Sequence, residues 1–248
     1  MKPSFAVVVP MFNEQSGAEK CISEISHELN FIDANCKIIA IDDGSSDRTS
    51  HILSSLVELN QNLHVLIHKQ NQGYGSALMT GIKKAHELGL SYVLFMDSDL
   101  TNQPADIIHF FKKMEKNADV IKATRYSDGG KVEGVPFKRR IISRVGNVIS
   151  RVLFRLPLTD PTNGFRALRT NLVYEINFKE KGFPIIMEEL YLFAGMHLNY
   201  ENVPVTLRNR SSDGRGSSFA YTPTQIFNYL KYPLMTYFRI QPNIDFKR

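Results

Sequence analysis

The sequence predicts an α/β fold with a mostly parallel central sheet and helices on both faces. Short apolar runs alternate with amphipathic segments over residues 5–124, and a cluster of polar residues follows several of the runs. A length of 248 residues suits one sizeable domain, and 43% hydrophobic with 22% charged residues argues against a disordered or collagen-like chain.

Five apolar runs are predicted to form strands, and the segments between them helices. The expected strands are Phe5–Val9, Lys37–Ile41, His64–Ile67, Tyr92–Met96 and Val120–Ala123. Apolar residues recur at helical spacing within residues 18–29, 52–59 and 78–85, which predicts three crossover helices. We expect one domain over residues 1–218, including a basic amphipathic segment at 137–156, and a helical or interfacial tail over 219–248.

Composition limits the compartment and the partners. The two cysteines, Cys21 and Cys36, have no metal-ligand spacing and cannot build a disulfide framework, so a reducing compartment is expected. No stretch approaches about 18 uncharged apolar residues, so any membrane contact should be peripheral. A net charge of +5 favours an anionic partner, and nucleic acid, phospholipid and phosphorylated substrates all qualify.

Acidic residues follow three of the predicted strands. Glu14 follows the first strand, Asp42 and Asp43 follow the second, and Asp97 and Asp99 follow the fourth. The carboxyl ends of parallel strands meet at one edge of a sheet, so these loops should face one crevice. Three acidic loops would repel a polyanion, which argues against a nucleic-acid partner.

The Asp97-Ser98-Asp99 segment predicts a site for Mg²⁺ or Mn²⁺. Such ions are bound by one or two carboxylates and complete their shell with substrate phosphates and water. The alternative is a helix cap, because Asp99 and Thr101 precede a helical run that starts at Pro104.

The other two loops predict a nucleotide site. Adjacent carboxylates at Asp42 and Asp43 repel each other and need donors, which a base and a ribose would offer. Pro10, Phe12 and Glu14 can add a rigid turn, an apolar face and an acceptor. As alternatives, the second loop is only a turn in which Asp47 caps the next helix, and Phe12 belongs to the core.

Several motifs in this order resemble a known family. Pro10-Met-Phe-Asn-Glu14, Asp42-Asp-Gly-Ser45, Asn71-Gln-Gly-Tyr-Gly75 and Asp97-Ser-Asp99 resemble family 2 glycosyltransferases of the GT-A, Rossmann-like fold. The stretches 124–143 and 160–166 are similar to the dolichol-phosphate mannosyltransferase branch and its polyprenyl-phosphate relatives. The similarity extends over roughly residues 5–219.

The resemblance implies roles for individual residues. Nucleotide contacts would come from Pro10, Phe12, Glu14 and Asp43, with Asp42 beside them, while Asp97 and Asp99, with Ser98 between them, would hold the metal and the diphosphate. Arg125 would neutralise the donor phosphate, and Arg139 and Ser143 would hold an acceptor phosphate.

Two departures from the family pattern leave parts of the site open. Relatives often carry Gln, a metal ligand, where this chain has Thr101. The basic C-terminal signature is present only as residues 210–218, so Arg208, Arg210 or Arg215 could reach the diphosphate. Glu188 lies where the family carries an acidic residue near the donor sugar; the alternative is a solvated carboxylate at a helix start.

The resemblance implies an inverting, metal-dependent enzyme that transfers a sugar, with GDP-mannose as the leading donor, to a polyprenyl (dolichyl) phosphate. A phosphate acceptor is already anionic near neutral pH, so no strong general base is required. The alternatives are a UDP-sugar donor, a soluble family 2 transferase acting on a glycan hydroxyl, and a non-enzymatic anion-binding domain. We expect a position on the cytoplasmic face of a membrane, with an anchoring subunit or a second copy as possible partners.

Residues 137–156 carry the membrane prediction. In a helix, four arginines form a stripe beside five Ile and Val residues, which suits a helix lying on anionic lipid. The arginines are Arg140, Arg144, Arg151 and Arg155, and the apolar residues are Ile141, Val145, Val148, Ile149 and Val152. The alternative is an ordinary surface helix whose Ile and Val residues pack on the core. The segment Tyr229–Ile240 could add a second contact or mediate self-association.

Overall fold

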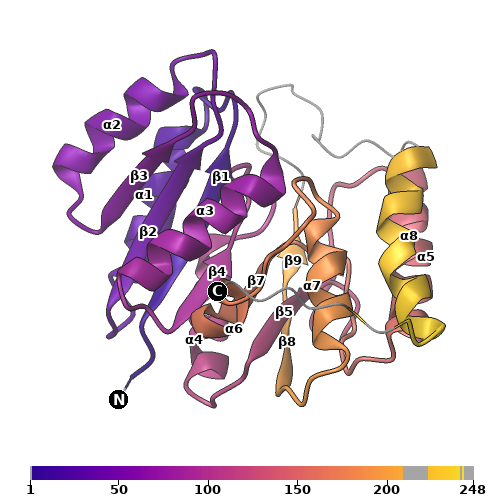
Figure 1. Ribbon diagram of the computed structural model, residues 1–248. Helices are drawn as coiled ribbons and strands as arrows, with labels where there is room; N and C mark the ends of the chain where they lie inside the picture. The colour runs from indigo at the N-terminus through magenta and orange to yellow at the C-terminus, as the bar shows by residue number, and fades with distance from the viewer. Residues whose placement is uncertain (1, 209–222, 241, 243–248) are drawn as a thin grey trace.

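A seven-stranded sheet forms the centre of the computed structural model, which describes residues 2–208, 223–240 and 242 except for the side chains of residues 138, 139, 223, 225 and 226 (Figure 1). The strand order is β3-β2-β1-β4-β7-β5-β8, and all neighbours are parallel except those of β7. The strands are β1 (Phe5–Met11), β2 (Cys36–Asp42), β3 (Leu63–Ile67), β4 (Tyr92–Phe95), β5 (Val120–Thr124), β7 (Arg166–Arg169) and β8 (Tyr200–Pro204). The predicted α/β class and all five predicted strands are confirmed.

Helices cover both faces of the sheet, as expected. The helices α1 (Ala18–Leu29), α2 (Thr49–Leu59) and α4 (Ile107–Met114) pack on one face, and α3 (Tyr74–Glu87), α6 (Thr170–Tyr174) and α7 (Ile185–Phe193) on the other. The alternation of side chains along β1 explains the two cores: Val7 joins Ile22 on one side, and Val8 joins Leu78 on the other.

The chain order of the strands reverses between β1 and β4. From β1 the chain moves outward to β2 and β3, and then returns to place β4 on the other side of β1. In a sheet of this kind the loops at the reversal separate and leave a crevice beyond the strand ends. The loops after β1, β2 and β4, which carry the predicted site residues, therefore lie at this crevice.

Two further helices lie together at one side of the molecule (Figure 1). They are α5 (Phe137–Phe154) and α8 (Pro223–Tyr237), and the Arg155 guanidinium lies over the Tyr237 ring, 5.1 Å from its centre. A parallel pair of short strands, β6 (Lys131–Val132) and β9 (Thr206–Leu207), lies in the chain before α5 and after β8. The predicted helix over 137–156 is confirmed, and it ends two residues early because Arg155 adopts a left-handed φ of 55°.

Helix α5 buries two polar residues and leaves most of its Ile and Val residues exposed. Asn147 and Ser150 are 2% and 1% exposed, whereas Val145 and Val152 are 53% and 62% exposed. Ile141, Ile142, Val148 and Ile149 are exposed as well. The alternative in which the Ile and Val residues of this helix pack on the core is therefore wrong. Within the described ranges, none of the helices is long and apolar enough to cross a membrane.

Candidate functional site

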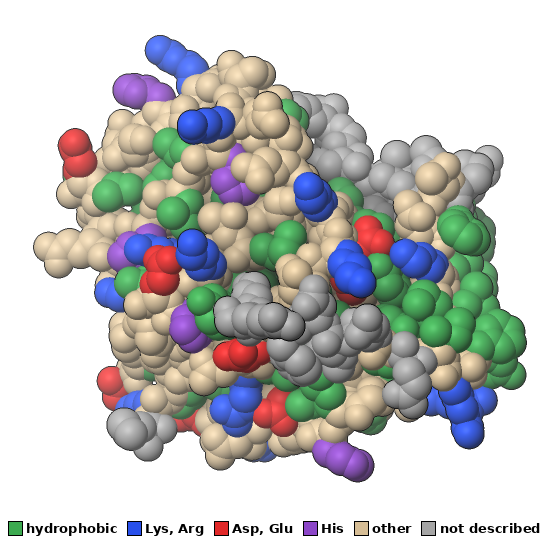
Figure 2. Space-filling view, viewed as in Figure 1, with side chains coloured by type: hydrophobic (Ala, Val, Ile, Leu, Met, Phe, Trp, Pro, Cys, Tyr) green, Lys and Arg blue, Asp and Glu red, His purple; other side chains and the backbone are tan. Residues whose placement is uncertain are grey.

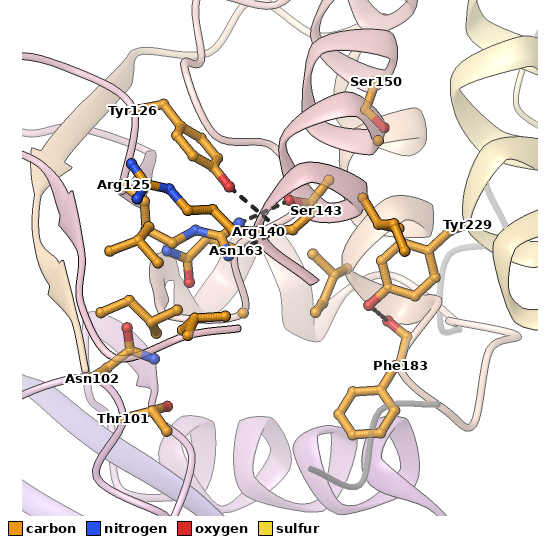
Figure 3. Close-up of a pocket in the computed structure, with 18 of the residues that line it drawn as sticks. Thr101, Asn102, Arg125, Tyr126, Arg140, Ser143, Ser150, Asn163, Phe183 and Tyr229 are labelled. Carbon is orange, nitrogen blue, oxygen red and sulfur yellow. Dashed lines mark hydrogen bonds between the residues drawn. The ribbon is translucent and has the colours of Figure 1, made fainter. Parts of the chain in front are cut away.

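A cavity of about 760 Å³ lies between the strand-end loops and the helices α5 and α8 (Figure 3). Its polar side includes Asp97, Asp99 and Arg125, which come from the loops after β4 and β5. Its other side is apolar and is formed by Ile141, Ile142, Val145 and Ile149 of α5 and Leu230 of α8. The cavity is therefore charged at one end and apolar at the other.

The first carboxylate of the predicted metal pair, Asp97, lies directly beyond β4 in a position poor in water. Burial first, and then the negative charge of Asp99, raise the pKa of Asp97 to about 6. The Arg166 guanidinium and a hydrogen bond from the Tyr74 hydroxyl lower it by less. Two mutually repelling carboxylates that are each only partly exposed fit a divalent cation, which would remove the repulsion.

The second carboxylate, Asp99, organises its own loop. Asp99 Oδ1 accepts hydrogen bonds from the Thr101 N–H (3.0 Å) and the Thr101 hydroxyl (2.9 Å). The following 3₁₀ turn η1 (Pro104–Asp106) is preceded by Gln103, which makes no side-chain capping bond. The helix-cap alternative for Asp99 and Thr101 is therefore wrong. No group of three His, Cys, Asp or Glu side chains suited to a metal is found among the described residues, so substrate phosphates and water would have to complete the shell.

A buried ion pair lies behind Asp97. Arg166 and Glu189 form a two-bond pair whose side chains are each 1% exposed, and Arg166 Nη1 also donates to the Gly164 carbonyl at 2.8 Å. The Arg166 guanidinium donates to the Tyr74 oxygen, and the Tyr74 hydroxyl donates to Asp97. Burial, followed by the charge of Asp97, holds the pKa of Tyr74 well above its usual value, so the phenol stays a donor.

The loop after β2 is satisfied largely within the chain. The Asp43 carboxylate accepts from the N–H groups of Gln72 (2.9 Å) and Gly73 (2.8 Å), and its Oδ1 lies 2.6 Å from His68 Nδ1. Asp43 therefore has the donors it was expected to need, and they come from the chain itself. Asp42 differs: Oδ1 accepts from the Ser45 N–H, while the fully buried Oδ2 has no hydrogen-bond partner.

The loops after β1 and β2 are tied to each other. Asn13, at a left-handed φ of 55°, receives a bond from the Ser46 N–H at 2.9 Å, and its own N–H donates to the Ser45 hydroxyl at 2.8 Å. Phe12 is 46% exposed, so the core alternative for this residue is wrong, whereas Glu14 is 9% exposed. Pro10 is half-buried at the end of β1.

Asp47 was predicted to cap helix α2, but the N-cap residue is Arg48, so this prediction is wrong. Asp47 lies one residue before the N-cap position, and its carboxylate still accepts a hydrogen bond from the first helical N–H, that of Thr49, at 2.9 Å. Of the remaining residues of the nucleotide prediction, Ser98 is buried between the two aspartates.

Arg125 brings the β5 loop and helix α5 together. It forms two bonds with Asp160, from Nε to Oδ2 (2.7 Å) and from Nη2 to Oδ1 (2.9 Å), and its Nη1 lies 3.3 Å from the Ser143 hydroxyl. The Tyr126 hydroxyl is 3.4 Å from the same Ser143 oxygen. The structure therefore places the predicted donor-phosphate and acceptor-phosphate residues side by side (Figure 3).

Three predicted residues fall wholly or partly outside the described part of the chain. Arg139 lies in α5 one turn before Ser143, but its side chain is not described. Arg210 and Arg215 lie in residues 209–222, which are not described. Arg208, the remaining candidate for the diphosphate, lines the cavity and donates to Gln103 Oε1 at 3.2 Å.

Glu188 is buried rather than solvated, being 4% exposed, so the solvated helix-start alternative is wrong. It accepts from the N–H groups of Lys179 (3.0 Å) and Glu180 (2.9 Å). This fixes a loop whose Lys181 carbonyl accepts from the Gly75 N–H at 2.7 Å. The Glu188 side chain and the backbone at Gly73 and Gly75 thus act mainly in structure.

Sequence reasoning missed four residues around the cavity: Tyr74, Asn102, Lys122 and Asn163. Each acts through a partner distant in the chain or through burial that a local pattern does not reveal. Lys122 is 0% exposed, its Nζ donates to the Asn163 carbonyl at 2.8 Å, and burial lowers its pKa to about 7. The motifs 71–75 and 160–166 contain Tyr74 and Asn163, but neither motif indicated a role for these residues.

The raised pKa of Asp97 predicts a pH-dependent cost to stability. The folded-state pKa is about 6 and the ordinary value is 3.8, so the carboxylate charge destabilises the fold above pH 6 and not below pH 3.8. In EDTA, Asp97→Asn should raise the free energy of unfolding by about 1–3 kcal/mol at pH 8, and the gain should fade toward pH 4. Urea unfolding of this variant and of the exposed control Asp128→Asn measures it; an equal gain at both pH values would contradict the assignment.

Comparison with known proteins places the chain in a family. The model of the family described as Glycosyl transferase family 2 matches residues 6–176. A dolichol-phosphate mannosyltransferase of Pyrococcus furiosus is 32% identical over 231 residues, which cover 92% of this chain and 62% of that protein. A polyprenol monophosphomannose synthase of Mycolicibacterium smegmatis is 25% identical over 82% of this chain and 77% of its own length. An undecaprenyl-phosphate mannosyltransferase of Micrococcus luteus is also 25% identical, over 82% of this chain and 83% of that protein.

Solved structures show the same fold. The glucosyl-3-phosphoglycerate synthase of Mycobacterium tuberculosis, in complex with phosphoglyceric acid, superposes with a TM-score of 0.68 at 19% identity, covering 94% of this chain and 80% of that one. Its complex with Mn²⁺, uridine diphosphate and glucosyl-3-phosphoglycerate gives 0.63, covering 86% and 73%. The expected GT-A fold is therefore confirmed. Because the family model spans more than half of the sequence, the chain belongs to Glycosyl transferase family 2.

Proposed function

We propose that this glycosyltransferase moves a sugar from a nucleotide-sugar to a polyprenyl phosphate at a membrane surface. The observation that carries the proposal is the cavity with a charged end at Asp97, Asp99 and Arg125 and an apolar end between α5 and α8. A nucleotide-sugar with its metal suits the charged end of the cavity. A lipid phosphate suits both ends, with its phosphate near the charged end and its apolar chain along the apolar end. The names of the three relatives, which refer to mannose and to dolichol, polyprenol or undecaprenyl lipids, agree with the proposed acceptor class.

The donor end is proposed to use Mg²⁺ or Mn²⁺ held by Asp97 and Asp99, and the bound cation would neutralise charge on the departing diphosphate. Arg125 would add a fixed positive charge beside it. GDP-mannose is the first candidate donor because the named relatives are mannosyltransferases, and a UDP-sugar is the second. Pro10, Phe12, Glu14, Asp42 and Asp43, in the loops after β1 and β2, do not line the cavity itself and are proposed to contact the nucleotide beyond its charged end.

The acceptor end is proposed to use Arg139 and Ser143 for the lipid phosphate. The Ser143 hydroxyl lies 3.3 Å from Arg125 Nη1, so an anion at Ser143 would lie beside the donor diphosphate. An acceptor oxygen forms a bond to the anomeric carbon while the bond to the diphosphate breaks and its electron pair leaves with that group. One displacement of this kind inverts the anomeric configuration, and an anionic acceptor needs no general base.

The membrane part of the proposal rests on an exposed apolar patch. We define the α5–α8 patch by its described members Phe137, Val145, Val148, Val152, Phe227, Leu234 and Phe238. Figure 2 shows hydrophobic side chains gathered over α8 and α5. Monomeric soluble proteins rarely expose such patches, and the neighbouring exposed Arg144, Arg151 and Arg155 suit an anionic lipid surface. The proposed location on the cytoplasmic face is supported only by two free, buried cysteines.

The first test of this proposal measures sugar transfer. Wild-type protein should transfer radiolabelled mannose from GDP-mannose, or glucose from UDP-glucose, to a polyprenyl phosphate in the presence of Mn²⁺. EDTA or Asp99→Ala should reduce the rate at least 100-fold, because charge stabilisation of this kind contributes about 10²–10³ in rate. The exposed control Asp128→Ala should keep the wild-type rate. Full turnover in EDTA would contradict the metal role, and transfer to no polyprenyl phosphate would contradict the proposal.

The second test concerns the α5–α8 patch. In flotation with liposomes containing anionic lipid, wild-type protein should rise with the vesicles, and Arg144→Glu with Arg151→Glu should reduce the floated fraction several-fold, since each charge near such a surface contributes about 1 kcal/mol. Lys112→Glu with Lys116→Glu makes the same charge change at the end of α4 and just after it, and this variant should float normally. If the wild type does not float and instead forms a stable dimer, a second copy covers the patch and the lipid assignment is wrong.

A further inference from the structure

Two buried amide side chains in the cavity have hydrogen-bonding atoms without partners. Asn102 is 4% exposed and its Oδ1 accepts no hydrogen bond, and Asn163 is 5% exposed and its Nδ2 donates none. Within the described part of the chain, Asn102 and Asn163 are the two cavity-lining residues that carry a buried side-chain atom without a hydrogen-bond partner. Buried polar atoms are nearly always paired in folded proteins, so an unpaired acceptor and an unpaired donor in one cavity indicate a ligand.

Asn163 is held rigidly by three hydrogen bonds. The Phe165 N–H donates to Asn163 Oδ1 at 3.0 Å, which identifies the other terminal atom of the amide as the NH₂ group. Lys122 Nζ donates to the Asn163 carbonyl at 2.8 Å, and the Asn163 N–H donates to the Asp160 carbonyl at 3.3 Å. The unpaired Nδ2 is thus a donor whose position is fixed before any ligand binds, which lowers the entropic cost of binding.

Both asparagines belong to loops that also approach or carry the predicted metal pair. A Cβ placed on Gly164, the residue after Asn163, would lie 3.8 Å from Asp97 Oδ2. Asn102 is three residues after Asp99, in a loop where Gln103 Nε2 donates to the Leu100 carbonyl at 2.9 Å and the Arg208 N–H to the Thr101 carbonyl at 2.9 Å. Figure 3 shows Asn102 and Asn163 entering the cavity from two different loops.

We propose that Asn102 and Asn163 bind hydroxyl groups of the donor sugar and help to determine which sugar is accepted. This inference rests on the proposed function. A sugar hydroxyl both donates and accepts, so it can satisfy Asn102 Oδ1 and Asn163 Nδ2. A diphosphate carries only acceptors and would leave Asn102 unsatisfied, and a metal ion would leave the Asn163 donor unsatisfied.

The chemistry of specificity favours this role. A site with buried polar groups that hydrogen-bond a substrate hydroxyl strongly rejects an analogue without that hydroxyl, because the buried groups are then left unpaired. Neutral amides suit a neutral sugar ring, whereas the charged groups around them, Asp97, Asp99 and Arg125, suit the metal and the phosphates. The two amides would therefore bind the sugar, and the charged residues would bind the metal and the phosphates.

The experiment compares each nucleotide-sugar with the nucleoside diphosphate that lacks the sugar. Dissociation constants for GDP-mannose and GDP, and for UDP-glucose and UDP, are measured calorimetrically with Mn²⁺. Asn102→Ala and Asn163→Ala should each weaken the accepted nucleotide-sugar about 10-fold and leave its nucleoside diphosphate unchanged. The matched control is Asn147→Ala, a buried asparagine of α5 whose Nδ2 donates to the Thr159 carbonyl at 3.0 Å, and it should change neither constant.

Asn163→Asp gives a second reading if Asn163→Ala folds poorly. It keeps the oxygen that accepts from Phe165 and removes the NH₂ donor, and it should again weaken the nucleotide-sugar more than the diphosphate. Equal weakening of both ligands would overturn the inference and indicate a phosphate, metal or structural role. Unchanged binding of both ligands would also overturn the inference. If the wild type binds neither pair, the proposed function fails; if the wild type transfers sugar while the variants bind it normally, this inference fails alone.

Discussion

The buried pair of Arg166 and Glu189 is the interaction on which the candidate site depends. It joins β7 to α7, and its guanidinium reaches Tyr74, which in turn donates to Asp97. Removal of either partner would leave a charge in an apolar interior, at a cost of roughly 3–5 kcal/mol. The same guanidinium opposes the repulsion between Asp97 and Asp99, so a structural ion pair helps two carboxylates remain close together at the end of β4.

The second constraint is the reversed orientation of α5. Its polar residues Ser143 and Ser150 line the cavity, and the buried Asn147 donates to the Thr159 carbonyl. Most of its Ile and Val residues are exposed, either at the apolar side of the cavity or at the surface beside the exposed arginines. A helix of this kind is stable at an interface, with its outer side in contact with apolar material. The exposed apolar residues of α5 are therefore explained both by the proposed lipid substrate and by the proposed contact with a lipid surface.

Local patterns were sufficient to predict much of the fold and the position of the site. Each strand from β1 to β5 is an apolar run, and each acidic loop follows its strand directly, so proximity in sequence places Asp42, Asp43, Asp97 and Asp99 at one edge. β7 was missed because it is four residues long, begins and ends in arginine, and enters the sheet antiparallel between β4 and β5. No local pattern predicts an insertion between strands 25 or more residues earlier in the chain.

The partners of individual side chains were the least predictable part of the site. Asp43 was expected to need a ligand, yet His68 and two backbone N–H groups, 25–30 residues away, satisfy it. Arg125 was expected to face only a donor phosphate, and it also contacts Asp160 and Ser143. Such pairings depend on how loops from different strands meet, and that information is not contained in the spacing of residues within any one loop.

The central claim is that one cavity holds the acceptor phosphate at Arg139 and Ser143, next to the donor. The most direct test uses a short, detergent-soluble prenyl phosphate without a bilayer and compares wild type with Arg139→Ala and Ser143→Ala, measuring the rate of transfer and the affinity for the nucleotide-sugar. The account predicts that both variants bind the donor as wild type does, and that their KM for the prenyl phosphate rises about 10-fold or more. Transfer near the wild-type rate in both variants at low prenyl phosphate concentrations would contradict the claim.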